Sequence, residues 1–442
     1  MAGDASPALL TDKYELTMLS AALRDGTAHR RTTFEVFARR LPEGRRYGVV
    51  AGTARLVEAL GDFVFDQPAL ASVAEFLSAD TVEYLRGFRF AGDIDGYPEG
   101  ELYFPGSPVL SVTGTFAECV VLETLALSIL NHDSAVASAA ARMVSAAGGR
   151  PLIEMGSRRT HEQAAVAAAR AAYIAGFSGT SNLEAGRRWG VPVLGTSAHA
   201  FTLLYSGDDS GPRGASDCDD WERAAFQAQI AELGVDTTLL VDTFDVRRGV
   251  ANAIAVAGSG LGAVRIDSGD LGVLVRQVRD QLDGLGATAT RIVVSGDLDE
   301  YAIAALRAEA VDSYGVGTSV VTGSGAPTAG MVYKLVEVDG VPVRKRSSSK
   351  ESHGGRKAAT RIADASGTLL EEVVHPVAAA PPATGGARRV TTSLVRAGEP
   401  VSGPGLDAAR DRVARGLGSL PWAGLALSRG EPAIPTRQMP AR

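Results

Sequence analysis

Hydrophobic and polar positions alternate with two different periods over the first 147 residues, and these periods predict a mixed α+β region. Apolar spacing predicts an amphipathic helix over 8–24 and another helix over 53–63, whereas alternation over 33–40 (TFEVFARR) predicts a half-buried strand. Glycine and proline recur every few residues over 88–115, which favours short antiparallel strands. The alanine-rich stretch 116–147 predicts a long helix.

After residue 150 the pattern changes to short apolar runs that end in small or polar residues and are followed by helical segments. The runs are PLIEMGSRR (151–159), FSGTSN (177–182), VPVLGTSAH (191–199), TTLLVDTFD (237–245), AVRIDSGD (263–270), RIVVSGDLD (291–299) and DSYGVGTS (312–319). Repeated strand–helix units with apolar strands indicate a parallel sheet, either doubly wound or closed as a barrel. Seven units without a glycine-rich dinucleotide loop after the first favour a β/α barrel.

These patterns divide the chain into three predicted segments. We predict an N-terminal α+β domain over 1–148, with 116–147 as a long connecting helix, and a catalytic β/α barrel over 149–335. Turn-rich β pattern returns beyond residue 340, so the segment 336–442 is predicted to be β-rich and to end in a flexible tail from residue 428.

Composition narrows the function classes. The 442 residues are 45% hydrophobic and 21% charged, with a net charge of −7 and a pI of about 5.5. This balance argues against general binding to nucleic acid or to a membrane surface, which needs a basic field. The two cysteines, Cys119 and Cys218, form no CxxC pattern, so neither a disulfide scaffold nor a structural zinc site is expected. No apolar leader opens the chain, and the apolar stretch 120–130 is too short to span a bilayer, so we expect a cytoplasmic protein.

In a β/α barrel the active site lies just past the carboxyl ends of the strands. The residues at those places here are Arg158, Thr180, Ser181, His199, Asp242, Arg265, Asp267, Ser268, Gly269, Asp270, Ser295, Gly296, Asp297, Gly315, Gly317 and Thr318. Turns rich in Gly, Ser and Thr present backbone N–H groups to phosphate, and arginines bind carboxylates or phosphates. Carboxylates hold Mg²⁺ and ribose hydroxyls. The set therefore predicts a sugar-phosphate or nucleotide substrate with Mg²⁺.

Each of these residues also has an ordinary structural interpretation. Ser268 or Asp270 fits a cap for the next helix, and Arg158 fits a surface ion pair. A single histidine such as His199 is most often a satisfied structural group. The functional interpretation rests on co-location, because seven consecutive strand ends all carry phosphate-type or acid–base residues.

Long ordered motifs over residues 8–360 resemble the nicotinate phosphoribosyltransferase family. They run from LLTDKYELTM (9–18) through TFEVFARRLP, EMGSRRTH, GTSNLEAGRRWGVPVLGTSAHAF, LLVDTFDVRRGVANAI, VRIDSGDL and VSGDLDEYAI to GVGTSVVTGSGAP. The resemblance implies a type II phosphoribosyltransferase fold, an irregular β/α barrel with a second α+β domain built from the N- and C-terminal segments. It also implies the first step of NAD salvage from nicotinate. In that reaction nicotinate, phosphoribosyl pyrophosphate, ATP and water give nicotinate mononucleotide, pyrophosphate, ADP and phosphate.

The resemblance implies roles for individual residues. His199 corresponds to the histidine that ATP phosphorylates, and Arg265 and Asp267 correspond to catalytic residues near the ring and ribose. Substrate binding is implied for Tyr14, Met155, Arg158, Thr180, Ser181 and Asp242, with Tyr14 reaching across a homodimer interface. Phosphate binding is implied for Ser268, Gly269, Ser295, Gly296, Asp297, Gly315, Gly317, Thr318, Lys334 and Lys350. Mg²⁺ would be held mainly by substrate phosphates, with Asp270 as the one protein candidate.

Four of the five lysines, Lys334, Lys345, Lys350 and Lys357, fall within 24 residues. The resemblance implies that this cluster approaches pyrophosphate or ATP phosphates, and the alternative is a solvated basic loop.

Two positions bear on substrate choice. Ser181 stands where nicotinamide-using relatives carry an aspartate, which would repel the nicotinate carboxylate, so Ser181 favours nicotinate. Met155 stands where the family usually has Phe, and a thioether covers a ring face with weaker or different stacking.

Two alternative functions are a nicotinamide phosphoribosyltransferase and a nucleotide-binding barrel without catalysis. A quinolinate-using relative is a further alternative, but it would need more cationic groups. The stretch 365–442 matches weakly, and no role is assigned to it.

Overall fold

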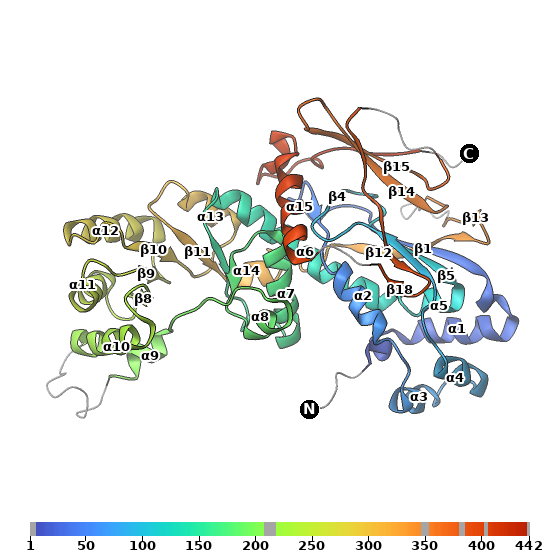
Figure 1. The fold of residues 1–442 in the computed structure, drawn as a ribbon, viewed down its shortest axis with the longest axis horizontal. Helices are drawn as coiled ribbons and strands as arrows, with labels where there is room; N and C mark the ends of the chain where they lie inside the picture. The colour runs from blue at the N-terminus through green and yellow to red at the C-terminus, as the bar shows by residue number, and fades with distance from the viewer. Residues whose placement is uncertain (1–5, 207–217, 346–352, 380–384, 402–404, 440–442) are drawn as a thin grey trace. The chain divides into compact units, whose positions relative to one another are not determined.

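The computed structural model describes residues 6–206, 218–345, 353–379, 385–401 and 405–439. The chain, drawn as a ribbon in Figure 1, divides into two compact units. The first unit joins residues 1–138 to residues 326–442, and the second consists of residues 139–325. Both ends of the chain therefore belong to the first unit.

The first unit is built on a seven-stranded antiparallel sheet with the order β13-β12-β1-β5-β3-β17-β18. Its strands are β1 (Arg31–Ala38), β3 (Asp93–Gly96), β5 (Leu110–Thr115), β12 (Met331–Val338), β13 (Val341–Pro342), β17 (Thr392–Arg396) and β18 (Glu399–Pro400). A four-stranded sheet, β16-β14-β15-β19, contains β14 (Lys357–Ala363), β15 (Leu369–Pro376), β16 (Ala387–Arg389) and β19 (Thr436–Gln438), and β2 (Gly48–Val49) pairs with β4 (Leu102–Tyr103). Strands from both ends of the chain thus share one sheet, as predicted for the second domain.

Helices complete the first unit around an apolar core. They are α1 (Lys13–Asp25), α2 (Thr53–Gly61), α3 (Gln67–Val73), α4 (Ala79–Arg86), α5 (Phe116–Val120) and α15 (Leu406–Gly418), with short 3₁₀ turns η1 (Pro7–Leu9), η2 (Thr27–His29) and η3 (Trp422–Leu425). In the core, Phe34 of β1 stacks on Tyr333 of β12 with ring centroids 4.8 Å apart. The first helix begins later than predicted because Asp12 has an extended backbone and residues 7–9 form a separate turn.

The predicted helix over 116–147 consists of two helices, α5 and α6 (Glu123–Ala147). α6 begins in the first unit and ends in the second. By length and composition the stretch Phe116–Ala147 is apolar enough to cross a membrane, but 61% of its most apolar window is buried inside the fold. Leu125 and Leu130, for example, belong to the core of the first unit. This burial is typical of a core helix.

The C-terminal third differs from the prediction in three places. Residues 331–335, predicted to end the barrel, lie in β12 and pair with β1 of the first unit, because Met331 and Tyr333 complete its core. The predicted β-rich segment contains the helix α15, whose Val413 is buried. The expected flexible tail includes β19, which pairs in parallel with β15 and so leaves part of the tail ordered.

The second unit is built on six parallel strands with the order β7-β6-β11-β10-β9-β8. These are β6 (Leu152–Glu154), β7 (Gly179–Thr180), β8 (Thr238–Leu240), β9 (Ala263–Ile266), β10 (Arg291–Val294) and β11 (Ser313–Val316). The helices are α7 (Glu162–Ala175), α8 (Leu183–Trp189), α9 (His199–Leu203), α10 (Cys218–Leu233), α11 (Val246–Ala257), α12 (Leu271–Gly284), α13 (Glu300–Leu306) and α14 (Thr318–Val321). Figure 1 shows α10, α11 and α12 following one another along β8, β9 and β10.

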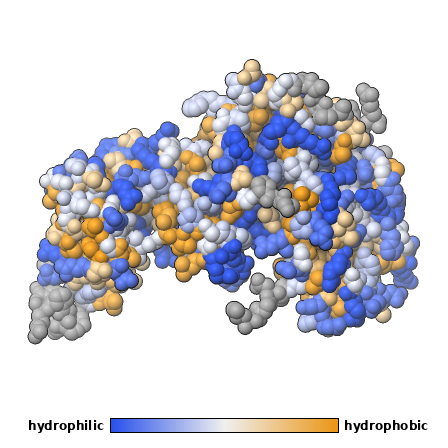
Figure 2. All heavy atoms as spheres, in the orientation of Figure 1, coloured by the Kyte–Doolittle hydropathy of each residue, from blue (hydrophilic) through white to orange (hydrophobic). Residues whose placement is uncertain are grey.

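Strands that follow one another in sequence pair, except β7 and β8, and β11 pairs with β6. This order is that of a barrel left open between β7 and β8. The seventh predicted strand, over 191–199, is wrong: a single bridge joins Val193 to Thr180. Only Val191 of this run is buried, and Val193 and Leu194 are 44% and 38% exposed. Figure 2 shows that apolar residues reach the surface among polar ones. The segment that leads to His199 therefore follows the open side of the sheet, and the predicted α/β fold with an irregular barrel is confirmed.

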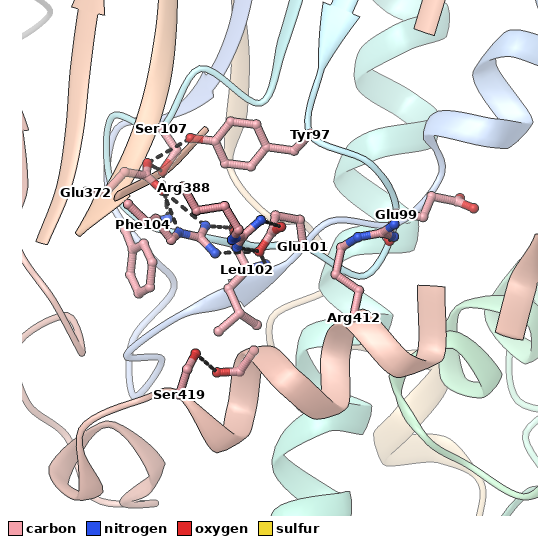
Figure 3. Close-up of polar contacts among 12 residues, drawn as sticks. Tyr97, Glu99, Glu101, Leu102, Phe104, Ser107, Glu372, Arg388, Arg412 and Ser419 are labelled. Atoms are coloured by element: carbon pink, nitrogen blue, oxygen red, sulfur yellow. Dashed lines mark hydrogen bonds and ion pairs between the residues drawn. The ribbon is translucent and has the colours of Figure 1, made fainter. Parts of the chain in front are cut away.

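A buried arginine joins the two sequence segments of the first unit. Arg361 of β14 is 1% exposed, donates to Glu372 of β15 at 3.0 Å and pairs with Glu101 beside β4. Figure 3 shows Tyr97 and Ser107 also converging on Glu372 and Arg388 approaching Glu101. Burial raises the pKa of Glu101, but the charges of Arg361 and Arg388 outweigh this effect and hold the pKa below its usual value. These buried contacts therefore hold the C-terminal four-stranded sheet against the N-terminal segment of the same unit.

We expect Arg361→Ala to lower the free energy of unfolding by about 3–5 kcal/mol, because it leaves Glu372 buried without its cation and Glu101 with the exposed Arg388 alone. Arg437→Ala is the matched control, since Arg437 pairs with Glu371 on the same sheet at 2.9 Å but is 52% exposed. That exposed pair is expected to contribute less than about 1 kcal/mol. Urea unfolding of the full chain measures both, and equal losses would contradict this account of the buried pair.

Candidate functional site

The carboxyl ends of β8, β9 and β10 are joined through two carboxylates, those of Asp242 and Asp267. Asp242 follows β8. Its side chain is 1% exposed, and its Oδ2 accepts hydrogen bonds from the Asp267 backbone N–H at 2.9 Å and the Ser268 hydroxyl at 2.7 Å. Asp267 in turn accepts a short hydrogen bond from the Ser295 hydroxyl, which follows β10. Because the strands are parallel, residues distant in sequence meet at one edge. The predicted residues Asp242, Asp267, Ser268 and Ser295 are therefore neighbours.

His199 begins α9 and lies beside the same carboxylates. Its Nε2 is 3.9 Å from Asp242 Oδ1 and 4.0 Å from Asp267 Oδ2. Its Nδ1 is 3.1 Å from the hydroxyl of Thr243. The imidazole is 39% exposed, so it is accessible while two carboxylates face one of its nitrogens. This is an arrangement that can stabilise positive charge on the ring.

A cavity of about 470 Å³ opens on the inner face of the sheet. Met155, Leu194, Thr196 and Arg265 are among its lining residues, but much of its wall, including Asp236, Ala263, Arg291 and Ser313, lies at the amino ends of the strands, away from His199. Arg265 donates to the Ser197 carbonyl at 3.3 Å, and its Nε is buried without a hydrogen-bond partner. Burial lowers the pKa of Arg265, and Asp267 and Asp242 oppose that change by attracting the cation. A partly desolvated guanidinium beside a thioether suits a flat, anionic ligand.

Two glycines allow these strand ends to approach closely. A Cβ at Gly296, whose φ is +121°, would lie 2.8 Å from the Asp267 carbonyl. A Cβ at Gly315 would lie 2.7 Å from the Met155 sulfur. Gly315 lies within β11 rather than past its end, so its contribution visible here is space for Met155. Gly317 precedes the short helix α14, which Thr318 begins.

Several predicted ligand groups are held by other protein groups. Thr180 is buried and its hydroxyl donates to Glu154, so it positions β7 against β6. Asp270 accepts from the Val273 backbone N–H at 3.3 Å and caps α12, which confirms the ordinary interpretation of this residue. Arg158, Ser181, Gly269 and Asp297 lie exposed at the strand ends. Gly269 has a φ of +87°.

Thr243 and Glu154 also belong to this edge, although neither was among the residues predicted from the sequence. Thr243 follows Asp242 directly in VDTFD, so its place at a strand end was the available indication. Glu154 is a carboxylate inside an apolar run, and such a residue needs partners when buried. It accepts from Thr180 and from the Gly156 backbone N–H. Burial raises the pKa of Glu154, and these hydrogen bonds oppose the change.

Three predicted ligands are not among the residues that these strands bring together. Tyr14 and Lys334 belong to the first unit, where Lys334 Nζ lies 3.9 Å from Glu123 Oε1. Lys350 lies outside the described residues. Lys357 is buried and donates to two backbone carbonyls and Glu35, so its ammonium is occupied within the fold.

Within the described ranges of the chain, no three His, Cys, Asp or Glu side chains gather closely enough to hold a metal ion.

Two family models match the chain. The model for the nicotinate phosphoribosyltransferase (NAPRTase) N-terminal domain matches residues 9–131, and the model for the NAPRTase family matches residues 151–371. The chain belongs to the nicotinate phosphoribosyltransferase family. Membership confirms the resemblance inferred from the motifs and the prediction that the chain is a phosphoribosyltransferase enzyme.

Full-length relatives and solved structures agree with this assignment. Nicotinate phosphoribosyltransferase pncB1 of Mycobacterium tuberculosis is 71% identical over 433 residues, which span 98% of this chain and 95% of the relative. The crystal structure of human nicotinic acid phosphoribosyltransferase is 28% identical, covers 97% of each chain and has a TM-score of 0.84. The nicotinate-nucleotide pyrophosphorylase from Pyrococcus furiosus, at 24% identity, covers 95% of this chain and 97% of its own and shares the fold with a TM-score of 0.77.

We expect Asp242→Ala to loosen the turn at 267–270, because the Asp267 N–H and the Ser268 hydroxyl lose their shared acceptor. Hydrogen bonds to a charged group contribute about 1.5–3 kcal/mol, so amide exchange of residues 267–270 should accelerate roughly 10–100-fold. Asp245→Ala is the control in the same motif: its carboxylate caps α11 through the Arg248 N–H at 2.9 Å. Faster exchange at 267–270 in both variants, or in neither, would remove Asp242 from this role.

Proposed function

We propose that this protein transfers the phosphoribosyl group of phosphoribosyl pyrophosphate to nicotinate, coupled to ATP hydrolysis, as the first step of NAD salvage from nicotinate. The geometry that carries the proposal is the strand-end cluster in which His199 faces Asp242 and Asp267 beside a cavity lined by Met155 and Arg265. The 71% identity to pncB1 over nearly the whole chain supports the same reaction.

In the proposed transfer, the nicotinate ring nitrogen attacks ribose C1 while the C1–O bond to pyrophosphate breaks, and pyrophosphate leaves with the bonding electrons. The ring nitrogen already has a lone pair, so no general base is required. Arg158 and Arg265 would bind the nicotinate carboxylate, and Met155 would cover the ring. Asp267 would stabilise positive charge developing on the ribose. Gly296, Gly317 and Thr318 would offer N–H and hydroxyl donors to the 5-phosphate. The Ser295 hydroxyl and N–H already donate to Asp267 and to the Ile266 carbonyl, so Ser295 would position this turn.

In the proposed coupling, ATP phosphorylates His199. An imidazole nitrogen attacks the γ-phosphorus, the bond from that phosphorus to the bridging oxygen breaks, and ADP leaves. Water later cleaves the N–P bond and releases phosphate. Asp242 and Asp267 would stabilise the imidazolium between these two events. Phosphorylation would favour the productive site and so couple ATP to synthesis.

The remaining partners are also proposals. Mg²⁺ would arrive on the phosphates of the substrates and neutralise charge on the departing pyrophosphate. A homodimer, in which Tyr14 of one copy stacks on the pyridine ring bound by the other, would complete the site. The exposed ring of Tyr14, 46% accessible in the single chain, supports this arrangement. We place the enzyme in the cytoplasm.

A product assay with Mg²⁺ and phosphoribosyl pyrophosphate tests the proposal by comparing nicotinate with nicotinamide, each with and without ATP. We expect mononucleotide from nicotinate only, increased by ATP with formation of ADP, because Ser181 offers no negative charge to the carboxylate. Preference for nicotinamide would contradict the specificity argument. If neither ring gives a product, the alternative of a nucleotide-binding barrel without catalysis would be favoured.

We expect His199→Asn to abolish ATP hydrolysis while slow ATP-independent synthesis continues. Asparagine keeps a polar side chain of similar size but has no nitrogen lone pair that can form the phosphoramidate. The ratio of ADP to nicotinate mononucleotide, measured under saturating ATP, distinguishes the two functions. Full coupling in this variant would remove His199 from the proposed mechanism.

A further inference from the structure

The three polar groups around His199 constrain which nitrogen carries the proton in the neutral ring. Nε2 faces two carboxylate oxygens, at 3.9 Å and 4.0 Å, and ionised carboxylates only accept hydrogen bonds. A lone pair on Nε2 would therefore point at negative charge, whereas an N–H there is attracted by it. Nδ1 then holds the lone pair, and the Thr243 hydroxyl at 3.1 Å is a donor to it.

The Asp242 carboxylate strengthens this assignment. Its Oδ2 already accepts from Asp267 and Ser268, whereas its Oδ1, the oxygen that faces His199, is buried without a hydrogen-bond partner. A buried carboxylate oxygen without a partner is costly, and the Nε2–H of His199 is the donor directed toward it.

We propose that Thr243 is a positioning residue that holds the His199 ring with its Nε2–H toward Asp242 and Asp267 and its Nδ1 unprotonated, so that Nδ1 can attack ATP once the Thr243 side chain turns away. The inference rests on the proposed ATP coupling. Without the hydroxyl, the ring is free to turn about its χ2 bond, and the fraction of molecules ready to react falls. Asp242 and Thr243 are adjacent in sequence, so one strand end supplies contacts to both nitrogens.

The chemical step is unchanged by this role. The N–P bond forms as the bond from the γ-phosphorus to the bridging oxygen breaks, and ADP leaves with that electron pair. The proton on Nε2 remains between the two carboxylates. Thr243 neither gains nor loses a proton. Its side chain must rotate about χ1 to move the oxygen out of the path of the γ-phosphorus, and its hydroxyl can then donate to a phosphoryl oxygen.

Thr243→Val and Thr243→Ser separate the hydroxyl from the shape of the side chain. Valine is nearly isosteric but has no hydroxyl, and serine keeps it. One hydrogen bond of this kind corresponds to roughly a 5–10-fold effect. We expect Thr243→Val to slow phosphohistidine formation from ATP by about that factor, with the KM for nicotinate and the ATP-independent synthesis within about twofold of the wild type. Serine should restore phosphorylation to within about twofold.

Thr290→Val is the matched control. Its hydroxyl donates a buried hydrogen bond of 2.9 Å to the Leu261 carbonyl just before β10 begins, at the opposite ends of the strands from His199. We expect this variant to lose stability but to keep its phosphorylation rate. Unchanged phosphorylation in Thr243→Val, or an equal loss in Thr243→Ser, would overturn the proposal, since the latter would point to the methyl group rather than the hydroxyl.

A second readout does not depend on activity. Nitrogen-15 NMR of the imidazole of His199, assigned by its loss in His199→Asn, reports which ring nitrogen is protonated at a pH where the ring is neutral. We expect the Nε2–H form in the wild type and in Thr243→Ser, and a mixture or line broadening in Thr243→Val. A wild-type ring protonated on Nδ1 would overturn the proposal even if ATP coupling is found. If the wild-type protein forms no phosphohistidine, the proposed ATP coupling is wrong. The nitrogen-15 spectrum would still test the contact between Thr243 and His199.

Discussion

The parallel direction of six short strands is the constraint on which the site depends. Parallel strands end at the same edge, so residues from 154 to 318 that are far apart in sequence become neighbours there. Because the sheet stays open between β7 and β8, that edge also has a free side. The segment ending at His199 follows this opening, and a fully closed barrel would have placed a seventh strand where the loop now runs.

Buried carboxylates organise both units. In the second unit, Asp242 joins the ends of β8 and β9, Asp267 joins β9 to β10, and Glu154 joins β6 to β7, each by accepting backbone or hydroxyl donors. In the first unit, Glu101 and Glu372 are paired with the buried Arg361. A buried acceptor without its donor is costly, so each of these residues allows few alternative arrangements of its neighbours. The active-site edge is thereby rigid where charge must be placed.

Much of the second unit was predictable because its pattern is local. Six of the seven expected strands form, and the polar residues that follow β8, β9 and β10 lie together as predicted. The run VPVLG failed because apolar residues alone do not specify a strand; Val193 and Leu194 have no second strand to pair with beyond one bridge. The helix α15 was missed although its buried residues Ala409, Val413 and Gly416 recur at helical spacing, because the turn-rich β pattern around it was extended over the whole of 336–442.

By itself the sequence determined the fold class, the order of the strand–helix units, the family and the residues that stand at the strand ends, because these follow from local periodicity and from long ordered motifs. The tertiary structure alone decided which of those residues touch. It buried Lys357 against Glu35 and brought Thr243 to His199. The physical reason is that a side chain's partners depend on which surfaces meet after folding, and one-dimensional spacing carries no information about that meeting.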